Sequence, residues 1–547
     1  MAETKEISRP ILGRDLSTFR NSEYTREATD LSRLTDSSAQ RDSSVYGNGL
    51  GDQRLTEMRL LAVEPDLGAA PERTRDYKGR IRTWPGILFL LLIVAGAVAL
   101  VTINAMHVND QANVNVERYE NAKRSSRRIK DGLDDDNVLI SDDGQVGNPK
   151  RYPDMGCELS DYQSKKGNIY AISKNGTEVA VGIKRLNWFG METGVAIPFG
   201  LWENMNNGTS IYEIAAFLSR NKFNSVRLPV CITSILKNTA PEKSLINMET
   251  NRAINITSYI TLVQTIVQAF GYRKISVMIS LHTLGPRGQG GAWYSNELGV
   301  TEDEYLSAVD ILTKNLCGPK YWNIIGLDLK NEPYKCTWGG KAPDWQKGST
   351  LIGNRMLEGG LADAGGNPPT FHVKNKLVYA PHYYNPGVDP AWYLYASGTQ
   401  TPSGTREDFV ELDNKTLKNN VEKTMEKMFG YLLTEHRTSA LAMGEFAGLY
   451  SKDAHPLLTT KRTTDFQIEL MLEADYAGAY VWSLNPESAY QYNPADTLGH
   501  FTEGLLQDDW LTPNKVFLEG MAPLDKIKNL KMFPCFPVDV KSDTNVE

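Results

Sequence analysis

Segments with the character of strands and of helices alternate between residues 179 and 484, and this alternation restricts the fold more than any other feature of the chain. The expected strands are apolar segments, at residues 179–189, 224–230, 275–282, 324–329, 377–384, 440–446 and 479–484. The expected helices lie between them, at residues 211–221, 256–272, 302–316, 417–436 and 466–476. Repeats of roughly 30 residues, each a buried strand and a helix, are typical of a parallel sheet covered by helices. The sequence therefore predicts an α/β fold, a (β/α)8 TIM barrel.

The expected strand at 324–329 leads into a carboxylate at a fixed place. The run is apolar except for Asp328, and it is followed by Asn331, Glu332 and Pro333. Proline has no backbone N–H, so the ladder of hydrogen bonds cannot continue through Pro333. In an α/β barrel the carboxyl ends of the strands converge on one mouth, where the active site lies. An ordinary strand end with a solvated glutamate would show the same local pattern, so Glu332 alone does not establish a site.

Other expected strands also end in polar or aromatic residues. These residues are Arg227, His282, His382, Tyr384, Glu445 and Trp482. Two glutamates on separate strands that face one mouth suit glycoside hydrolysis, because one protonates the leaving oxygen while the other attacks the sugar or activates water. Either glutamate could instead be a structural partner of Arg227. The accompanying His, Tyr and Trp residues favour catalysis.

Eight stretches, in this order along the chain, resemble glycoside hydrolase family 5 and, within it, the endo-β-1,4-glucanases or cellulases. They are LNWFGMET (186–193), FGLW (199–202), VRLP (226–229), LH (281–282), GLDLKNEP (326–333), HYY (382–384), MGEF (443–446) and VWSLNPE (481–487). The resemblance spans about residues 165 to 520. The chain is also similar to membrane-anchored members of the family from oomycetes.

The resemblance implies a role for each matching residue. Glu332 would be the general acid/base and Glu445 the nucleophile of a retaining double displacement. Asn331 would donate a hydrogen bond to the sugar 2-OH, and Arg227 and Tyr384 would hold Glu445 ionised and oriented. Burial beside an apolar wall would keep Glu332 protonated until it acts.

The remaining site residues are aromatic. Trp202 and Trp482 would offer flat faces to sugar rings, with core packing as the equal alternative for either one. His282 and His382 are expected to orient neighbouring groups rather than bind a metal, because the chemistry needs no metal and no third ligand is evident. We therefore expect no metal and no cofactor.

Several functions remain open at this point. The first is hydrolysis of β-1,4-glucan, in cellulose or mixed-linkage glucan; a β-1,3-glucanase or a mannanase would share the same catalytic pair. From a different class comes a catalytically impaired membrane protein that binds cell-wall glucan. In each case the partner is a β-linked polysaccharide. A net charge of -7 spread over 547 residues does not indicate the basic surface that nucleic-acid binding needs.

The N-terminal part predicts a membrane anchor. Residues 1–83 are polar with few aromatics, which indicates a disordered cytosolic tail. The run from Trp84 to Ile103 carries no charge and is long enough to cross a bilayer. Arg and Lys residues crowd its N-terminal side, whereas the first one after it is Arg118, so the N-terminus is expected in the cytosol. We predict a signal-anchor at 84–108 in a type II single-pass protein of the plasma membrane.

The remainder of the chain is then expected to be extracellular. We predict a solvated stalk at 109–160, the hydrolase barrel at 161–525 and a tail at 526–547. Four glycosylation sequons agree with this side of the membrane, at Asn175, Asn207, Asn255 and Asn414. All five cysteines also lie beyond residue 150, without metal-ligand spacing. We expect Cys157 to pair with Cys535, which would join the ends of the domain.

One barrel repeat is missing from the pattern. Between Glu332 and Leu377 a barrel needs a helix, a fifth strand and its loop, but the chain supplies only a helix at 345–357 and the Gly-rich run 358–366. The resemblance implies a strand here. We infer that about 25 to 35 residues, one βα repeat, are absent between Leu357 and Leu361 through alternative splicing or an imperfect gene model. The flanking strands would then keep unpaired edges. The alternative is a fifth strand disguised within residues 350–356.

Overall fold

The computed structural model describes residues 83–126, 149–202, 208–288, 291–357, 373–401, 406–435, 438–494 and 501–538. The chain divides into two compact units, one that contains helix α2 (Thr83–Ser126) and one that contains the residues from 149 onward. Residues 1–82 of the predicted tail lie outside the described residues, as do residues 127–148 of the predicted stalk and the Gly-rich run 358–366.

Helix α2 contains the predicted anchor. Its segment Trp84–Asn113 is long and apolar enough to cross a membrane. The large apolar side chains of this segment are exposed, as Trp84 and Leu100 illustrate at 75% and 71%. The helix is therefore compatible with a membrane anchor. It continues past the predicted boundary at residue 108 to Ser126, so the first part of the predicted stalk is helical.

A parallel sheet forms the centre of the second unit. Its strands are β4 (Ile183–Asn187), β5 (Ser225–Cys231), β6 (Ser276–Thr283), β7 (Ile324–Asp328), β8 (Val378–Tyr379), β9 (His382–Tyr384), β12 (Ala440–Ala447) and β13 (Gly478–Trp482). Their order is β7-β6-β5-β4-β13-β12-β8, and β9 also pairs with β12. Every pair is parallel. The predicted α/β barrel type is confirmed.

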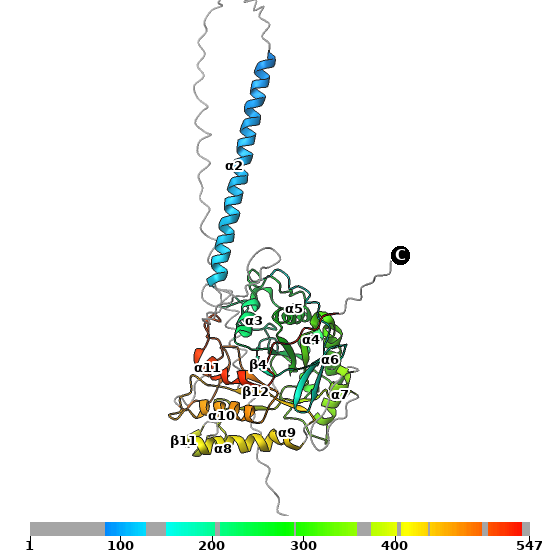
Figure 1. The fold of residues 1–547 in the computed structure, drawn as a ribbon, viewed down its shortest axis with the longest axis vertical. Coiled ribbons are helices and arrows are strands. Elements are labelled where there is room, and N and C mark those ends of the chain that lie inside the picture. The colour runs from blue at the N-terminus through cyan, green and yellow to red at the C-terminus, as the bar shows by residue number, and fades with distance from the viewer. Residues whose placement is uncertain are drawn as a thin grey trace, which may run out of the picture. The chain divides into compact units, whose positions relative to one another are not determined.

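Helices follow the strands and surround the sheet (Figure 1). They are α3 (Ile211–Arg220), α4 (Ile232–Lys237), α5 (Tyr259–Gly271), α6 (Glu302–Leu316), α7 (Trp345–Leu357), α8 (Asn414–Met425), α9 (Tyr431–Glu435), α10 (Thr459–Glu473) and α11 (Lys515–Gly520). Capping boxes start α5 at Ser258 and α6 at Thr301. Both helices bury their apolar faces, α5 with Leu262 and Ile266 and α6 with Tyr305. Their sequence periodicity thus fixes which face covers the sheet.

The described sheet does not close into a ring. At one end β7 pairs with β6 alone, and at the other β8 and β9 pair with β12 alone, among the described residues. Every residue of β7 is partly exposed, whereas every residue of β4, β5, β12 and β13 is buried. No strand lies between β7 and β8 in the described ranges, and residues 350–356 belong to α7, so the alternative of a disguised fifth strand there is wrong.

Smaller elements complete the unit. Strands β1 (Asp161–Lys165), β2 (Asn168–Ile172) and β3 (Glu178–Ala180) form an antiparallel sheet, and β10 (Tyr395–Gln400) with β11 (Arg406–Glu411), and β14 (Ala489–Tyr490) with β15 (Phe501–Thr502), form antiparallel pairs. Short 3-10 segments are η1 (Lys243–Leu245), η2 (Asn296–Leu298), η3 (Pro319–Tyr321), η4 (Trp392–Leu394) and η6 (Ala522–Lys526). A π-helical segment, η5 (Glu426–Gly430), separates α8 from α9.

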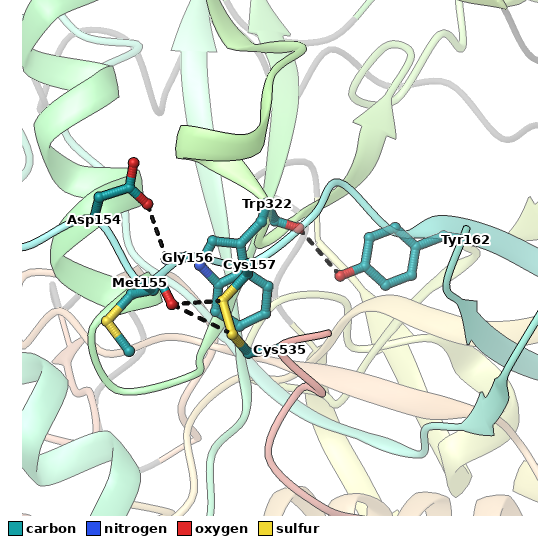
Figure 2. The surroundings of a disulfide bond; sticks show 7 residues. All are labelled: Asp154, Met155, Gly156, Cys157, Tyr162, Trp322 and Cys535. Atoms are coloured by element: carbon teal, nitrogen blue, oxygen red, sulfur yellow. Dashed lines mark hydrogen bonds between the residues drawn. A yellow bond between two sulfur atoms is a disulfide. The ribbon is translucent and has the colours of Figure 1, made fainter. Parts of the chain in front are cut away.

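A disulfide joins the two ends of the barrel unit. Figure 2 shows Cys157 bonded to Cys535, as predicted, with a Cα–Cα distance of 5.1 Å. Tyr162 lies beside it and donates a hydrogen bond to the carbonyl of Trp322 at 3.4 Å (Figure 2). The bridge ties the segment before β1 to the chain's last described stretch.

Candidate active site

The strand order and register bring the predicted polar residues to one end of the sheet. Asn187 at the end of β4 lies beside Arg227 of β5, and Glu445 of β12 lies beside His382 of β9. Trp482 is the last residue of β13. Because side chains alternate between the two faces of a strand, these positions point into the barrel rather than toward the helices.

Arg227 is the central cation of the site. It is fully buried, and its Nη1 donates to Glu445 Oε1 at 2.5 Å and to Asn187 Oδ1 at 2.8 Å. Its Nε and Nη2 donate to Asp328 Oδ2 at 3.0 and 2.5 Å, and Nη2 also donates to Asn331 Oδ1 at 2.9 Å. Burial alone would lower the pKa of Arg227, but the carboxylates of Asp328 and Glu445 outweigh it and raise the pKa. One planar guanidinium therefore fixes four neighbours.

Glu445 is held through both of its carboxyl oxygens. Its side chain is buried, Arg227 donates to Oε1, and the hydroxyl of Tyr384 donates to Oε2. The Nδ1 atom of His382 lies 3.5 Å from the same Oε2. These contacts fix the plane of the carboxylate through both of its oxygens.

Glu332 follows β7 and is less enclosed than predicted. Its side chain is 38% exposed, because β7 lies at the open end of the sheet, so the expected burial is not observed. Its Oε1 lies 3.3 Å from His382 Nδ1. The backbone φ of 45° is in the left-handed region, which non-glycine residues rarely adopt.

The two glutamates and His382 converge. Their potential ligand atoms, one from each residue, all lie within 4.8 Å of one another. Carboxyl groups about 5 to 5.5 Å apart are typical of retaining glycosidases, and about 6.5 to 9.5 Å of inverting ones. Three such ligands could also hold a cation, but Arg227 already places a positive charge 2.5 Å from Glu445 and would repel it. The arrangement therefore fits a catalytic carboxylate pair better than a metal centre.

His382 connects the two carboxyl groups electrostatically. Burial would lower its pKa, but the nearby Glu445 carboxylate and the contact with Glu332 raise it overall. The two carboxyl groups therefore favour the protonated form of its imidazole.

The two predicted tryptophans lie in one aromatic row. Trp482 is 7% exposed and stacks on Phe189, with ring centroids 5.5 Å apart at an interplanar angle of 11°. His282 lies nearly parallel to Trp482 at 6.2 Å. Trp202 packs against Phe199 at 5.8 Å and against Trp510 at 6.0 Å. Trp482 thus lies at the strand ends beside His282, whereas Trp202 is partly buried and packs against Phe199 and Trp510.

Five site residues were not singled out from the sequence. Asn187 and Asp328 bind Arg227, and Ser280 donates to Asp328 at 2.8 Å. Burial would raise the pKa of Asp328, but Arg227 outweighs this and lowers it. The sequence could have indicated Asp328 as a site residue, because it is the only charged residue within the apolar run 324–329. The local sequence did not indicate Lys330 or Glu192 as site residues, because burial of a charged side chain depends on neighbours from other strands.

Glu192 is, like Glu445, a buried carboxyl group near the site. It is 7% exposed, and its Oε2 accepts a hydrogen bond from the backbone N–H of Gly190 at 2.8 Å. Burial raises its pKa to about 7; Arg227 lowers it and Glu445 raises it by smaller amounts. Burial therefore favours the protonated form of this carboxyl group.

A parallel (β/α) barrel with two carboxyl groups close together at its strand ends is the arrangement that glycoside hydrolases use. Residues 172–488 match the family model described as Cellulase (glycosyl hydrolase family 5). The chain belongs to glycosyl hydrolase family 5.

Individual relatives agree with this assignment. The chain is 26% identical to the major extracellular endoglucanase of Xanthomonas campestris over 360 residues, which is 60% of this chain and 65% of that protein. It is 24% identical to an endoglucanase of Paenibacillus polymyxa over 66% of this chain and 86% of that one. The solved endocellulase of Pyrococcus horikoshii matches 68% of this chain and 98% of its own, with a TM-score of 0.54 and 24% identity, and supports the fold.

Proposed function

We propose that this protein is a retaining endo-β-1,4-glucanase, with Glu332 as general acid/base and Glu445 as nucleophile. The observation that carries the proposal is the approach of Glu332, His382 and Glu445 to within 4.8 Å, with Arg227 and Tyr384 on the two oxygens of Glu445. The names of the two curated relatives, both endoglucanases, support the substrate class.

In the first step a Glu445 oxygen attacks the anomeric carbon of the sugar. The bond from that carbon to the glycosidic oxygen breaks, and the carboxyl proton of Glu332 passes to the departing oxygen. Arg227 and Tyr384 restrict the Glu445 carboxylate to one orientation. This restriction lowers the entropic cost of reaching the attacking geometry. A glycosyl ester of Glu445 results.

In the second step water replaces Glu445. The Glu332 carboxylate, now a base, takes a proton from water while the water oxygen bonds to the anomeric carbon and the ester bond breaks. His382, near both carboxyl groups, stabilises whichever of them is ionised. The product keeps the configuration of the substrate.

The linkage is tested by release of reducing ends. Full-length protein should act on carboxymethylcellulose and mixed-linkage β-glucan, with little action on laminarin, a β-1,3-glucan, or on mannan. Action confined to laminarin or mannan would replace the proposed substrate with one of the other linkages that share this catalytic pair.

The second candidate is a catalytically impaired glucan-binding membrane protein, and the open sheet favours it. Glu332 follows the partly exposed β7, and among the described strands β7 pairs with β6 alone. The strand that positions the proposed acid/base therefore has a neighbour on one side only within the described residues. Retention of glucan without release of reducing ends, in both the unmutated protein and Glu445→Gln, would identify this second function.

We further propose that α2 anchors the protein with residues 1–83 in the cytosol and 109–547 outside, at the plasma membrane. Three sequon asparagines, Asn175, Asn255 and Asn414, are exposed in the structure. The Cys157–Cys535 disulfide is typical of an oxidising compartment. In sealed microsomes the barrel should resist protease until detergent is added; digestion without detergent would reverse the topology.

A further inference from the structure

Lys330 lies between Asp328 and Glu332 in the sequence and is a buried cation. The proposed mechanism does not use it. Its side chain is 4% exposed. The Nζ atom donates to the carbonyl of His282 at 3.0 Å and to the carbonyl of Asn331 at 2.5 Å. The ammonium thus joins the end of β6 to the first peptide group before Glu332.

The backbone that Lys330 holds is strained. Glu332 has a φ of 45°, a conformation that costs energy unless the surroundings enforce it. Its own carbonyl accepts hydrogen bonds from Gly291 at 2.9 Å and Tyr334 at 2.8 Å. The carbonyl before it, on Asn331, accepts from Lys330. Contacts on both sides of Glu332 therefore maintain the geometry that aims its carboxyl group.

Lys330 also brings a charge close to Glu332. The charged and titratable groups that face Lys330 are Glu332, Asp328, Cys336 and Arg227. Glu332 also faces His382, whose Nδ1 lies 3.3 Å from its Oε1. Burial lowers the pKa of Lys330 to about 8, although Glu332 and Asp328 oppose the change, so the ammonium persists at neutral pH. A buried positive charge favours the ionised form of a neighbouring carboxyl group.

We propose that Lys330 is a positioning residue for Glu332, whose ammonium holds the strained peptide before it and whose charge sets the pH range over which Glu332 can donate a proton. The inference rests on the proposed function. It assigns Lys330 no contact with the substrate, because the side chain is buried.

The test compares leaving groups. Phenyl β-cellobioside needs a proton from the acid, whereas 2,4-dinitrophenyl β-cellobioside leaves with little help. For Lys330→Met in the full-length protein, kcat/KM for the phenyl substrate should fall about ten- to hundredfold, as expected for a misplaced acid. The kcat/KM for the dinitrophenyl substrate should change little, because it does not depend on the acid. An unchanged value also shows that the variant is folded. Lys314→Met, at an exposed lysine on α6, is the matched control.

The pH profile separates the charge from the hydrogen bonds. Lys330→Gln keeps a donor but removes the charge, so the basic limb of kcat/KM on the phenyl substrate should move to higher pH. Lys330→Arg keeps the charge and should leave the limb in place.

Equal losses on both substrates, or a basic limb that does not move in Lys330→Gln, would overturn the inference while the proposed function stands. Hydrolysis of neither substrate by the unmutated protein would overturn the proposed function and this inference together.

Discussion

Arg227 shows how one residue can organise a site. Its guanidinium contacts Asn187, Asp328, Asn331 and Glu445, and no lysine could reach all four, because an ammonium lacks the planar fork. The sequence predicted that Arg227 would hold Glu445. It did not predict that Arg227 would also bind Asp328, because that contact joins strands two places apart in the sheet.

Loss of the Arg227 fork should cost both activity and stability. Arg227→Lys keeps one charge, while Arg227→Met leaves the buried Glu445 and the partly buried Asp328 without the cation that pairs with them. We expect Arg227→Met to lower the free energy of unfolding by about 3 to 5 kcal/mol, and Arg227→Lys to lower it less. Thermal unfolding and kcat/KM on phenyl β-cellobioside measure the two effects. A fully active, equally stable Arg227→Met would contradict this account of the site.

Glu192 should make stability depend on pH. Its pKa in the folded protein is raised from 4.5 to about 7, so the folded state keeps a proton that the unfolded chain has lost. Stability should therefore fall as pH rises from about 4.5 to about 7 and stay lower above that. Glu192→Gln removes this loss and should be more stable than the unmutated protein at pH 8, by up to about 3 kcal/mol, but not at pH 4.5.

Denaturant unfolding at the two pH values measures this difference. Glu297→Gln, at an exposed position, is the control and should show no such gain. A Glu192→Gln variant whose advantage is the same at both pH values would show that Glu192 does not titrate as proposed.

At the scale of elements, the sequence predicted what local pattern determines. The expected helices at 302–316 and 345–357 coincide with α6 and α7. The expected strand at 377–384 is divided into β8 and β9, because Pro381 lacks the N–H that a continuous strand needs. The β10–β11 hairpin was missed, since its polar, largely exposed residues carry no apolar period.

Beside the open sheet, the buried cation Arg185 interacts with Tyr480 but forms no ion pair with a carboxylate among the described residues. Arg185 lies two residues before Asn187 in β4 and faces the barrel interior, stacked 4.3 Å over the ring of Tyr480. It is 2% exposed, and its Nε and Nη2 have no hydrogen-bond partner within the described ranges. Alternate strands of a barrel contribute to one interior layer, so a fifth strand would lie across the barrel from β4 and could supply an acceptor.

Arg185→Met should therefore stabilise the chain. Replacement of a buried cation that lacks a carboxylate partner by an apolar side chain of similar length is expected to raise the free energy of unfolding by roughly 1 to 4 kcal/mol. Thermal unfolding measures the change, with Lys237→Met, an exposed position on α4, as the control. A lower melting temperature would show that the contacts of Arg185 with Tyr480 outweigh the cost of burying its charge. Sequencing of the transcript across codons 357–361 tests the missing repeat directly.

At the scale of the whole molecule, long-range links hold the barrel unit together. The Cys157–Cys535 bond spans 378 residues and restricts the unfolded chain. Its pairing was predictable from the positions of the cysteines, whereas the helical state of residues 109–126 was not, because their mixed charges indicated only a solvated segment.

Removal of this bond should destabilise the barrel. The double variant Cys157→Ala/Cys535→Ala is expected to lose about 2 to 5 kcal/mol of stability. Thermal unfolding without reductant measures the loss. Cys317→Ala, an exposed free cysteine, is the control and should unfold like the unmutated protein. Equal melting temperatures for all three proteins would show that the bridge contributes nothing to the folded state.

The central claim is that Glu445 forms a covalent glycosyl ester, and trapping of that ester tests it most directly. The full-length protein is incubated with 2,4-dinitrophenyl 2-deoxy-2-fluoro-β-cellobioside, and its peptides are analysed by mass spectrometry. We expect one fluorocellobiosyl adduct, on Glu445, and none in Glu445→Gln. An adduct on another residue, or hydrolysis of cello-oligosaccharides with inversion and no adduct, would contradict the account.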